Sequence, residues 1–158
     1  MKNKLSTILT AIFCSLFFTI TLSADNTKNT ESNGVKQQTE SIDKRISLGL
    51  TAAEKEDFLA EMRQMLNSIQ GIMAGIGSND RSLIIKRARY SGNRMARETP
   101  ESVKKKTPAE FKQLGGPTHM KFEELAVRAE DDDMDELAAL TGDLMKNCLA
   151  CHAMFKVE

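Results

Sequence analysis

Hydrophobic residues recur three and four positions apart through most of the chain after residue 50, and this spacing predicts amphipathic helices. The first helix is expected to begin at Thr51, because Thr51 and Glu54 have the spacing of a capping box. A glycine-containing turn at residues 75–79 is expected to end this helix. The apolar face of the helix would consist of Phe58, Met62, Met65, Ile69, Ile72, Met73 and Ile76.

A second helix, rich in lysine and arginine, is expected from residue 80 to about residue 97. Residues 98–107 then contain Pro100 and three consecutive lysines, which favours a loop. Thr107 and Glu110 have the spacing of a second capping box, with a proline at the favoured first helical position. The sequence therefore predicts that a third helix begins there.

A Gly-Gly-Pro sequence at residues 115–117 should kink or interrupt the third helix. The acidic run at residues 130–133 should end it and place negative charge at the start of a fourth helix, where the helix dipole favours it. No stretch has the alternation of a strand. We therefore predict an all-α domain, an antiparallel up-and-down four-helix bundle around one core.

The N-terminus has the anatomy of a secretory signal peptide. A short basic head with Lys2 and Lys4 precedes an uncharged apolar stretch over residues 5–22, and small residues follow up to Ala24. We expect cleavage after Ala24. A retained membrane anchor is the alternative, because the apolar stretch is just long enough to span a bilayer.

After residues 1–24, residues 25–50 are polar and carry few apolar side chains. Such a segment cannot bury enough surface to order itself, so we expect a flexible N-terminal arm. The helical domain would then occupy residues 51–158. Export implies a periplasmic protein without a membrane attachment after cleavage.

Composition narrows the possible chemistry. The 158 residues include 22 basic and 22 acidic side chains, and loss of the signal peptide changes the net charge from zero to −2. A chain without a basic surplus is not typical of nucleic-acid-binding proteins. Of three cysteines, Cys14 lies in the signal peptide, so two cysteines and two histidines remain. Any reactive chemistry must come from these few side chains or from a cofactor.

Cys148, Cys151 and His152 form the C-x-x-C-H pattern of covalent c-type haem attachment. On a helix, residues at positions i, i+3 and i+4 share one face. Both thiols could then form thioethers with the two vinyl groups of one porphyrin, and the His152 imidazole could ligate the iron. The pattern predicts one haem c per chain.

Three other uses of these residues compete with haem attachment. A thioredoxin-like C-x-x-C would follow a strand in an α/β pattern, which is absent here. A zinc site would need a fourth ligand, for which His119 or a carboxylate is available. A local disulfide between Cys148 and Cys151 is chemically possible in an exported protein. Export and the helical pattern together favour haem.

The position of the motif in the last helix, with Phe155 and Lys156 after it, resembles the class II cytochromes c, the cytochrome c-prime and cytochrome c-556 group. The resemblance covers roughly residues 51–156, and its specific part is the motif itself. It implies a four-helix bundle with haem between the helices near the C-terminal helix, His152 as proximal iron ligand, and a possible homodimer.

In this family the sixth iron position distinguishes two functions. The resemblance implies that a methionine of the first helix gives a six-coordinate iron suited to electron transfer, whereas a non-ligand leaves a site for small gases. Met65 and Met62 are the candidates, and counting back from the turn after the helix favours Met65. Either methionine could instead be a core residue. His119 is a further candidate, although a surface or supporting role is the simpler interpretation.

Arginines at positions 63, 87 and 89 are candidate partners for the haem propionates, and could equally form a solvated surface. Lys104, Lys105 and Lys106 are expected to form a solvated loop. The alternative is a docking patch for an acidic redox partner. Our hypothesis is an exported electron carrier, not an enzyme, that serves redox partner proteins of a respiratory or periplasmic chain. The alternative is a five-coordinate haem protein that binds nitric oxide or carbon monoxide. A zinc or disulfide module without haem is a third possibility.

Overall fold

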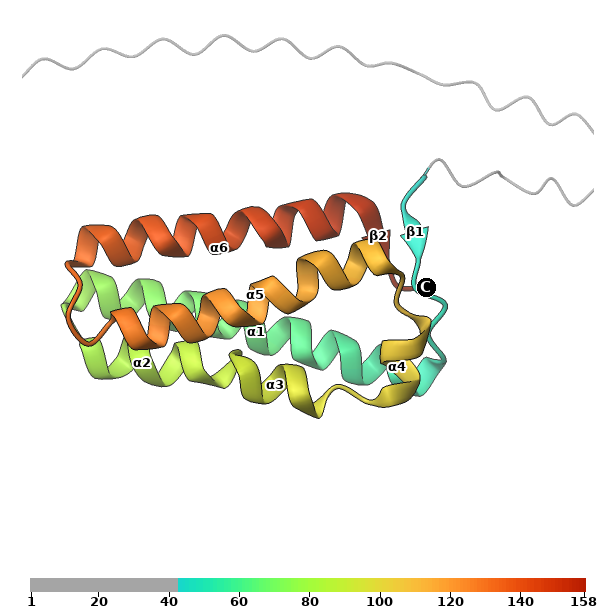
Figure 1. Cartoon of the computed structure of the whole chain (residues 1–158), viewed down its shortest axis with the longest axis horizontal. Helices are drawn as coiled ribbons and strands as arrows, with labels where there is room; N and C mark the ends of the chain where they lie inside the picture. Colours follow the sequence, from blue (N-terminus) through green and yellow to red (C-terminus); the bar gives the residue numbers. More distant parts are fainter. Residues whose placement is uncertain (1–42) are drawn as a thin grey trace, which may run out of the picture. The chain divides into compact units, whose positions relative to one another are not determined.

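A computed structural model of the chain describes residues 43–158 (Figure 1). The predicted signal peptide, and residues 25–42 of the predicted arm, lie outside the described residues. The described part of the chain is predominantly helical, which confirms the all-α fold class. None of its helices combines the length and hydropathy that crossing a membrane requires.

Helix α1 (Ala52–Ser78) begins after Thr51, as the sequence predicts, and ends just before Asn79, the last residue of the predicted turn, so that residues 75–78 are still helical. The Glu54 backbone N–H donates to the Thr51 hydroxyl oxygen at 3.3 Å, and the Thr51 backbone N–H donates to the Glu54 carboxylate at 2.8 Å. This reciprocal pair is the expected capping box. At the other end Asn79 adopts a left-handed conformation with φ of 54°, and its N–H bonds carbonyls of the last turn.

The predicted second helix is divided into α2 (Arg81–Tyr90) and α3 (Asn93–Glu98). The division falls at Gly92, where an added Cβ atom would lie 2.4 Å from a carboxylate oxygen of Glu123. That carboxylate also accepts a hydrogen bond from the Asn93 backbone N–H at 3.3 Å. The single-helix prediction was wrong here because a contact with a distant helix, and not local periodicity, decides the break.

Residues 98–107 contain a short helix, α4 (Glu101–Lys106), where a loop was expected. It begins after Pro100 and buries Val103. The second capping box is also wrong: helix α5 (Ala109–Arg128) has no side-chain cap, and the Thr107 hydroxyl instead donates to the Lys104 carbonyl at 3.1 Å. The Thr107 side chain thus bonds the last turn of α4 and does not cap α5.

Helix α5 continues through Pro117, so the expected interruption is absent. The Thr118 hydroxyl donates to the Leu114 carbonyl at 2.7 Å, one position from the carbonyl that Pro117 leaves without its usual donor. Helix α6 (Met134–Met154) follows the acidic turn as predicted. Its first turn carries acidic side chains, which the helix dipole favours.

Strands β1 (Ile46–Ser47) and β2 (Phe155–Lys156) pair in parallel, in the register Ile46–Phe155 and Ser47–Lys156. The expectation of a strand-free chain is corrected by this pair. Two residues are too few to produce a period-two pattern, so the sequence carried no signal for it. The ordered body also begins before Thr51, since Leu48 is only 4% exposed.

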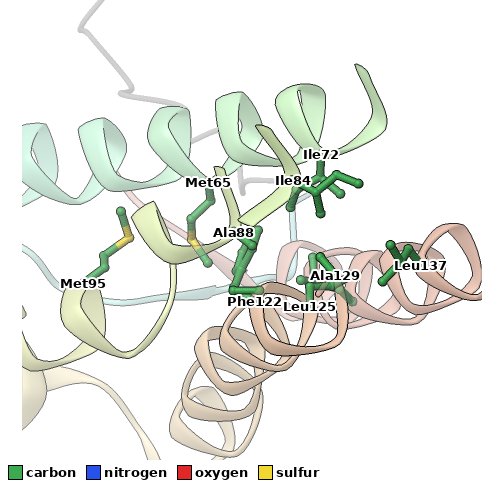
Figure 2. Packing of buried hydrophobic residues seen from close by; sticks show 11 residues of the cluster. Met65, Ile72, Ile84, Ala88, Met95, Phe122, Leu125, Ala129 and Leu137 are labelled. Atoms are coloured by element: carbon green, nitrogen blue, oxygen red, sulfur yellow. The ribbon is translucent and has the colours of Figure 1, made fainter. Parts of the chain in front are cut away.

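The core lies among the four longer helices. Helix α1 contacts α2 and α6, and α5 contacts the same two helices. Figure 2 shows Met65 of α1 directed toward Ala88 of α2 and Phe122 of α5, with Ile72 against Ile84 further along. The buried side chains include Met65, Ile72, Ile84, Ala88, Phe122, Leu125, Leu137 and Leu144.

Candidate functional site at the end of α6

The cysteine–histidine motif occupies the last turns of α6, as the sequence predicts. Cys148 and Cys151 are half-buried free thiols, and His152 is exposed. Cys148 packs against the core cluster, and its Sγ lies 3.8 Å from the Leu144 carbonyl oxygen. The two thiols are therefore one helical turn apart on the half of α6 that meets the rest of the domain.

Burial raises the pKa of the Cys148 thiol above its ordinary value. Burial also raises the pKa of Cys151, with a further increase from the charge of the neighbouring Cys148. The raised pKa lowers the thiolate fraction of both side chains, and the thiolate is the form that attacks in disulfide exchange.

Three aromatic rings lie beside the motif. Phe111 of α5 contacts Phe58 of α1, with 5.9 Å between ring centroids, and it meets Phe155 edge-on at 5.4 Å. Phe155 follows α6 directly and is buried. The first turns of α1 and the last turn of α6 therefore lie at the same end of the domain (Figure 1).

The two sixth-ligand candidates differ in depth along α1 and in burial. Met62 and Met65 lie four and seven residues beyond Phe58, which is about 6 Å and about 10 Å along α1. Met65 is 8% exposed and belongs to the buried core, whereas Met62 is only partly buried against it.

His119 of α5 faces a different neighbour. Its Nδ1 lies 2.8 Å from the carbonyl oxygen of Ser91, the residue that ends α2. A carbonyl can only accept, so Nδ1 carries the hydrogen of this bond. The buried Ser91 hydroxyl donates to Ser68 of α1 at 2.8 Å. His119 thus supports the junction of α2 and α3, through a contact with Ser91 that the sequence did not indicate.

The arginine candidates are dispersed. Arg89 forms an ion pair with Glu123 at 2.7 Å, and Arg63 is exposed on α1. The stem of Arg87 crosses Gly71, and its buried Nε has no hydrogen-bond partner among the described residues. The structure does not bring these three arginines together at the motif.

Two lysines of the predicted docking patch have acidic partners. Lys104 pairs with Glu101 at 2.9 Å, and Lys106 pairs with Glu54 at the start of α1.

A groove of about 490 Å³ lies over α2, α3 and α5. It is lined by Arg89, Tyr90, Asn93, Arg94, Arg97 and Glu123, and the motif does not contribute to it.

Within residues 43–158, no group of three or more histidine, cysteine, aspartate or glutamate side chains is arranged to hold a metal ion. Comparisons with protein-family models, with curated proteins and with solved structures found no match to this chain.

Proposed function

We propose that this chain is an exported c-type cytochrome that carries single electrons through one haem attached at Cys148 and Cys151. The observation that carries the proposal is the motif on α6, with two free thiols one turn apart and an exposed histidine at the next position. No substrate is transformed in this role. The cofactor would supply an iron that cycles between two oxidation states.

The residues of the motif fit a covalently attached haem. A thioether forms when a thiol adds across a vinyl group, with sulfur bonding one carbon and hydrogen going to the other, so the reaction needs reduced cysteines, and both cysteines of the motif are free thiols. Among the described residues no hydrogen bond occupies the His152 ring, which leaves its nitrogens available to iron. The neighbouring Phe58, Phe111 and Phe155 would shield one end of an apolar ring from water.

The proposed architecture is an antiparallel four-helix bundle made of α1, α2, α5 and α6, with α3 and α4 in the connection between α2 and α5. The contacts of α1 and α5 with both other helices, and the short turns after α1 and α5, support it. This arrangement is the one implied by the resemblance to the class II cytochromes c, with haem near α6.

Met65 and Met62 are the proposed candidates for the sixth ligand, together with His152 as the proximal ligand. The family resemblance favours Met65, whereas the partial burial of Met62 leaves that side chain less committed to the core than Met65. A thioether ligand would raise the reduction potential relative to a second histidine. In either case the ligand comes from the helix that packs against α6.

A second candidate function is a haem protein with a vacant sixth position that binds nitric oxide or carbon monoxide. The burial of Met65 in the core favours this alternative, because a side chain used for packing is not free to reach iron. In that case both methionines are packing residues.

The test is to express the full chain in a host that matures c-type cytochromes. The optical spectrum of the purified protein is then recorded in both redox states. We expect covalent haem in the wild type and its loss in a Cys148→Ala, Cys151→Ala double variant. Mass spectrometry of the exported product should place its N-terminus at residue 25. A wild-type protein without covalent haem would overturn the proposal.

The same protein distinguishes the two candidate functions. A low-spin spectrum with a methionine–iron charge-transfer band supports electron transfer, and a high-spin spectrum that responds to carbon monoxide supports gas binding. Met62→Leu and Met65→Leu keep the side-chain volume and remove the thioether. The variant that loses the band identifies the ligand, and the other serves as its matched control.

A further inference from the structure

Residues 45–48, which we call the N-terminal strap, lie along the end of α6. Ile46 and Ser47 pair with Phe155 and Lys156, and the Leu48 N–H donates to the Lys156 carbonyl at 3.0 Å. The Leu48 side chain is buried, which anchors the strap to the domain. The pairing begins at Phe155, the first residue after α6, so the backbone remains hydrogen-bonded beyond the last turn of the helix.

Arg45 extends this contact into the motif itself. One of its terminal guanidinium nitrogens donates to the His152 carbonyl oxygen at 3.2 Å. Its Nε and its other terminal nitrogen donate to Asp43, at 3.0 Å and 2.7 Å, which orients the planar group. The guanidinium therefore bridges a carboxylate and the end of the helix.

The His152 carbonyl is one of the last four of α6, and such carbonyls lack a partner within the helix. A cation at this end is favoured by the helix dipole as well as by the hydrogen bond. The contact uses only the backbone of His152, so its imidazole stays unoccupied. Arg45 thus holds the last turn of α6 through its backbone, and the His152 side chain remains available.

We propose that Arg45 is a positioning residue that fixes the direction of the His152 imidazole by holding the last turn of α6. The direction of a helical side chain follows its backbone, and the final turn of a helix frays when its carbonyls are unpaired. The consequence for iron ligation rests on the proposed function. The effect on the backbone and on the His152 rotamer does not.

The first test uses the haem-free mature chain. Arg45→Met retains the stem and removes the guanidinium, and Lys44→Met removes the same charge from the adjacent exposed position. We expect the Leu48 and Phe155 amides to exchange about threefold faster in Arg45→Met, while Lys44→Met leaves them unchanged. The three-bond Hα–Hβ couplings of His152 should move toward rotamer averaging in Arg45→Met alone. Arg45→Lys, which can still donate to the carbonyl, should restore both readouts in part.

The second test uses the haem-loaded protein. Arg45→Met should shift the midpoint potential and the spectroscopic signature of the axial histidine relative to both wild type and Lys44→Met. Unchanged amide exchange and couplings in Arg45→Met would overturn the inference. If amide exchange changes in Arg45→Met but the midpoint potential and the axial-histidine signature do not, the strap only stabilises the end of α6, and the positioning role is overturned. A wild type that acquires no haem contradicts the proposed function, and the couplings in the haem-free chain then decide the inference by themselves.

Discussion

Replacing Met65 separates a packing role from an iron-ligating role for the same side chain. Met65 is 8% exposed and belongs to the buried cluster formed by α1, α2, α3, α5 and α6. Figure 2 shows it directed into that cluster, opposite Ala88 and Phe122. Met62 lies one turn earlier on α1 and is only partly buried against the same cluster.

The structure sets the size of the effect. Truncation of a buried methionine to alanine costs about 2–5 kcal/mol, through lost transfer free energy and the cavity that remains. A domain of this size has a free energy of unfolding of about 5–15 kcal/mol, so Met65→Ala would remove a large part of it. Met65→Leu nearly conserves volume and should cost less than about 1.5 kcal/mol. Met62→Ala should cost about 1 kcal/mol, because part of that side chain already contacts water.

The assay is urea unfolding of the haem-free protein over residues 25–158, followed by circular dichroism, for wild type and the three variants. An unchanged slope of free energy against urea shows that the compared states are the same. A smaller cost for Met65→Ala than for Met62→Ala would show that Met65 is not the more deeply buried of the two side chains, and would refute its placement in the core. Because no haem is present, the result does not depend on iron ligation.

Two further predictions concern α1 and its first turn. An added Cβ at Gly71 would lie 2.4 Å from Cγ of Arg87, whereas an added Cβ at Gly77 would have nothing within 4 Å. In thermal unfolding, Gly71→Ala should therefore destabilise the domain by about 1–3 kcal/mol. Gly77→Ala should be neutral or should stabilise the domain. A hydrogen bond from Lys106 lowers the pKa of Glu54 from 4.5 to about 2. The carboxylate thus contributes stability that is fully present above pH 4.5 and is lost as pH falls toward 2. The melting temperature should fall further over this range in wild type than in Glu54→Gln, and an equal fall would contradict the assignment.

Local signals in the sequence were sufficient for some elements and insufficient for others. Helix α1 was predicted at both ends because its capping box and its left-handed Asn79 lie within a few residues of the helix they delimit. The division of α2 from α3 depends on Glu123, which is 30 positions from Asn93 in the chain. The β1–β2 pair joins residues still further apart. The hydrophobic periodicity of a sequence does not indicate contacts between residues so far apart in the chain.

The candidate site divides in the same way. The motif is contiguous, so its residues and their common face could be predicted from helical geometry alone. In the proposed cytochrome the sixth ligand would depend on how α1 packs against α6, which is a tertiary property. Counting residues gave Met65, which is buried in the core, whereas Met62 is only partly buried. Arg45 fell within a segment expected to be an unstructured arm, and nothing local indicated its contact.

The environment of the two cysteines bears on which of their possible products forms. In a helix, Cα atoms three positions apart lie about 5 Å from each other, which is within the range that a disulfide tolerates. Spacing alone therefore does not prevent Cys148 and Cys151 from oxidising in a periplasm. Disulfide formation proceeds through a thiolate, and burial raises the pKa of both thiols. Thioether formation adds a thiol across a vinyl group and consumes no oxidant, whereas a disulfide needs a two-electron oxidant. In the proposed cytochrome, the burial that lowers the thiolate fraction of both cysteines thus slows their oxidation and helps to keep them reduced, the state that haem attachment requires.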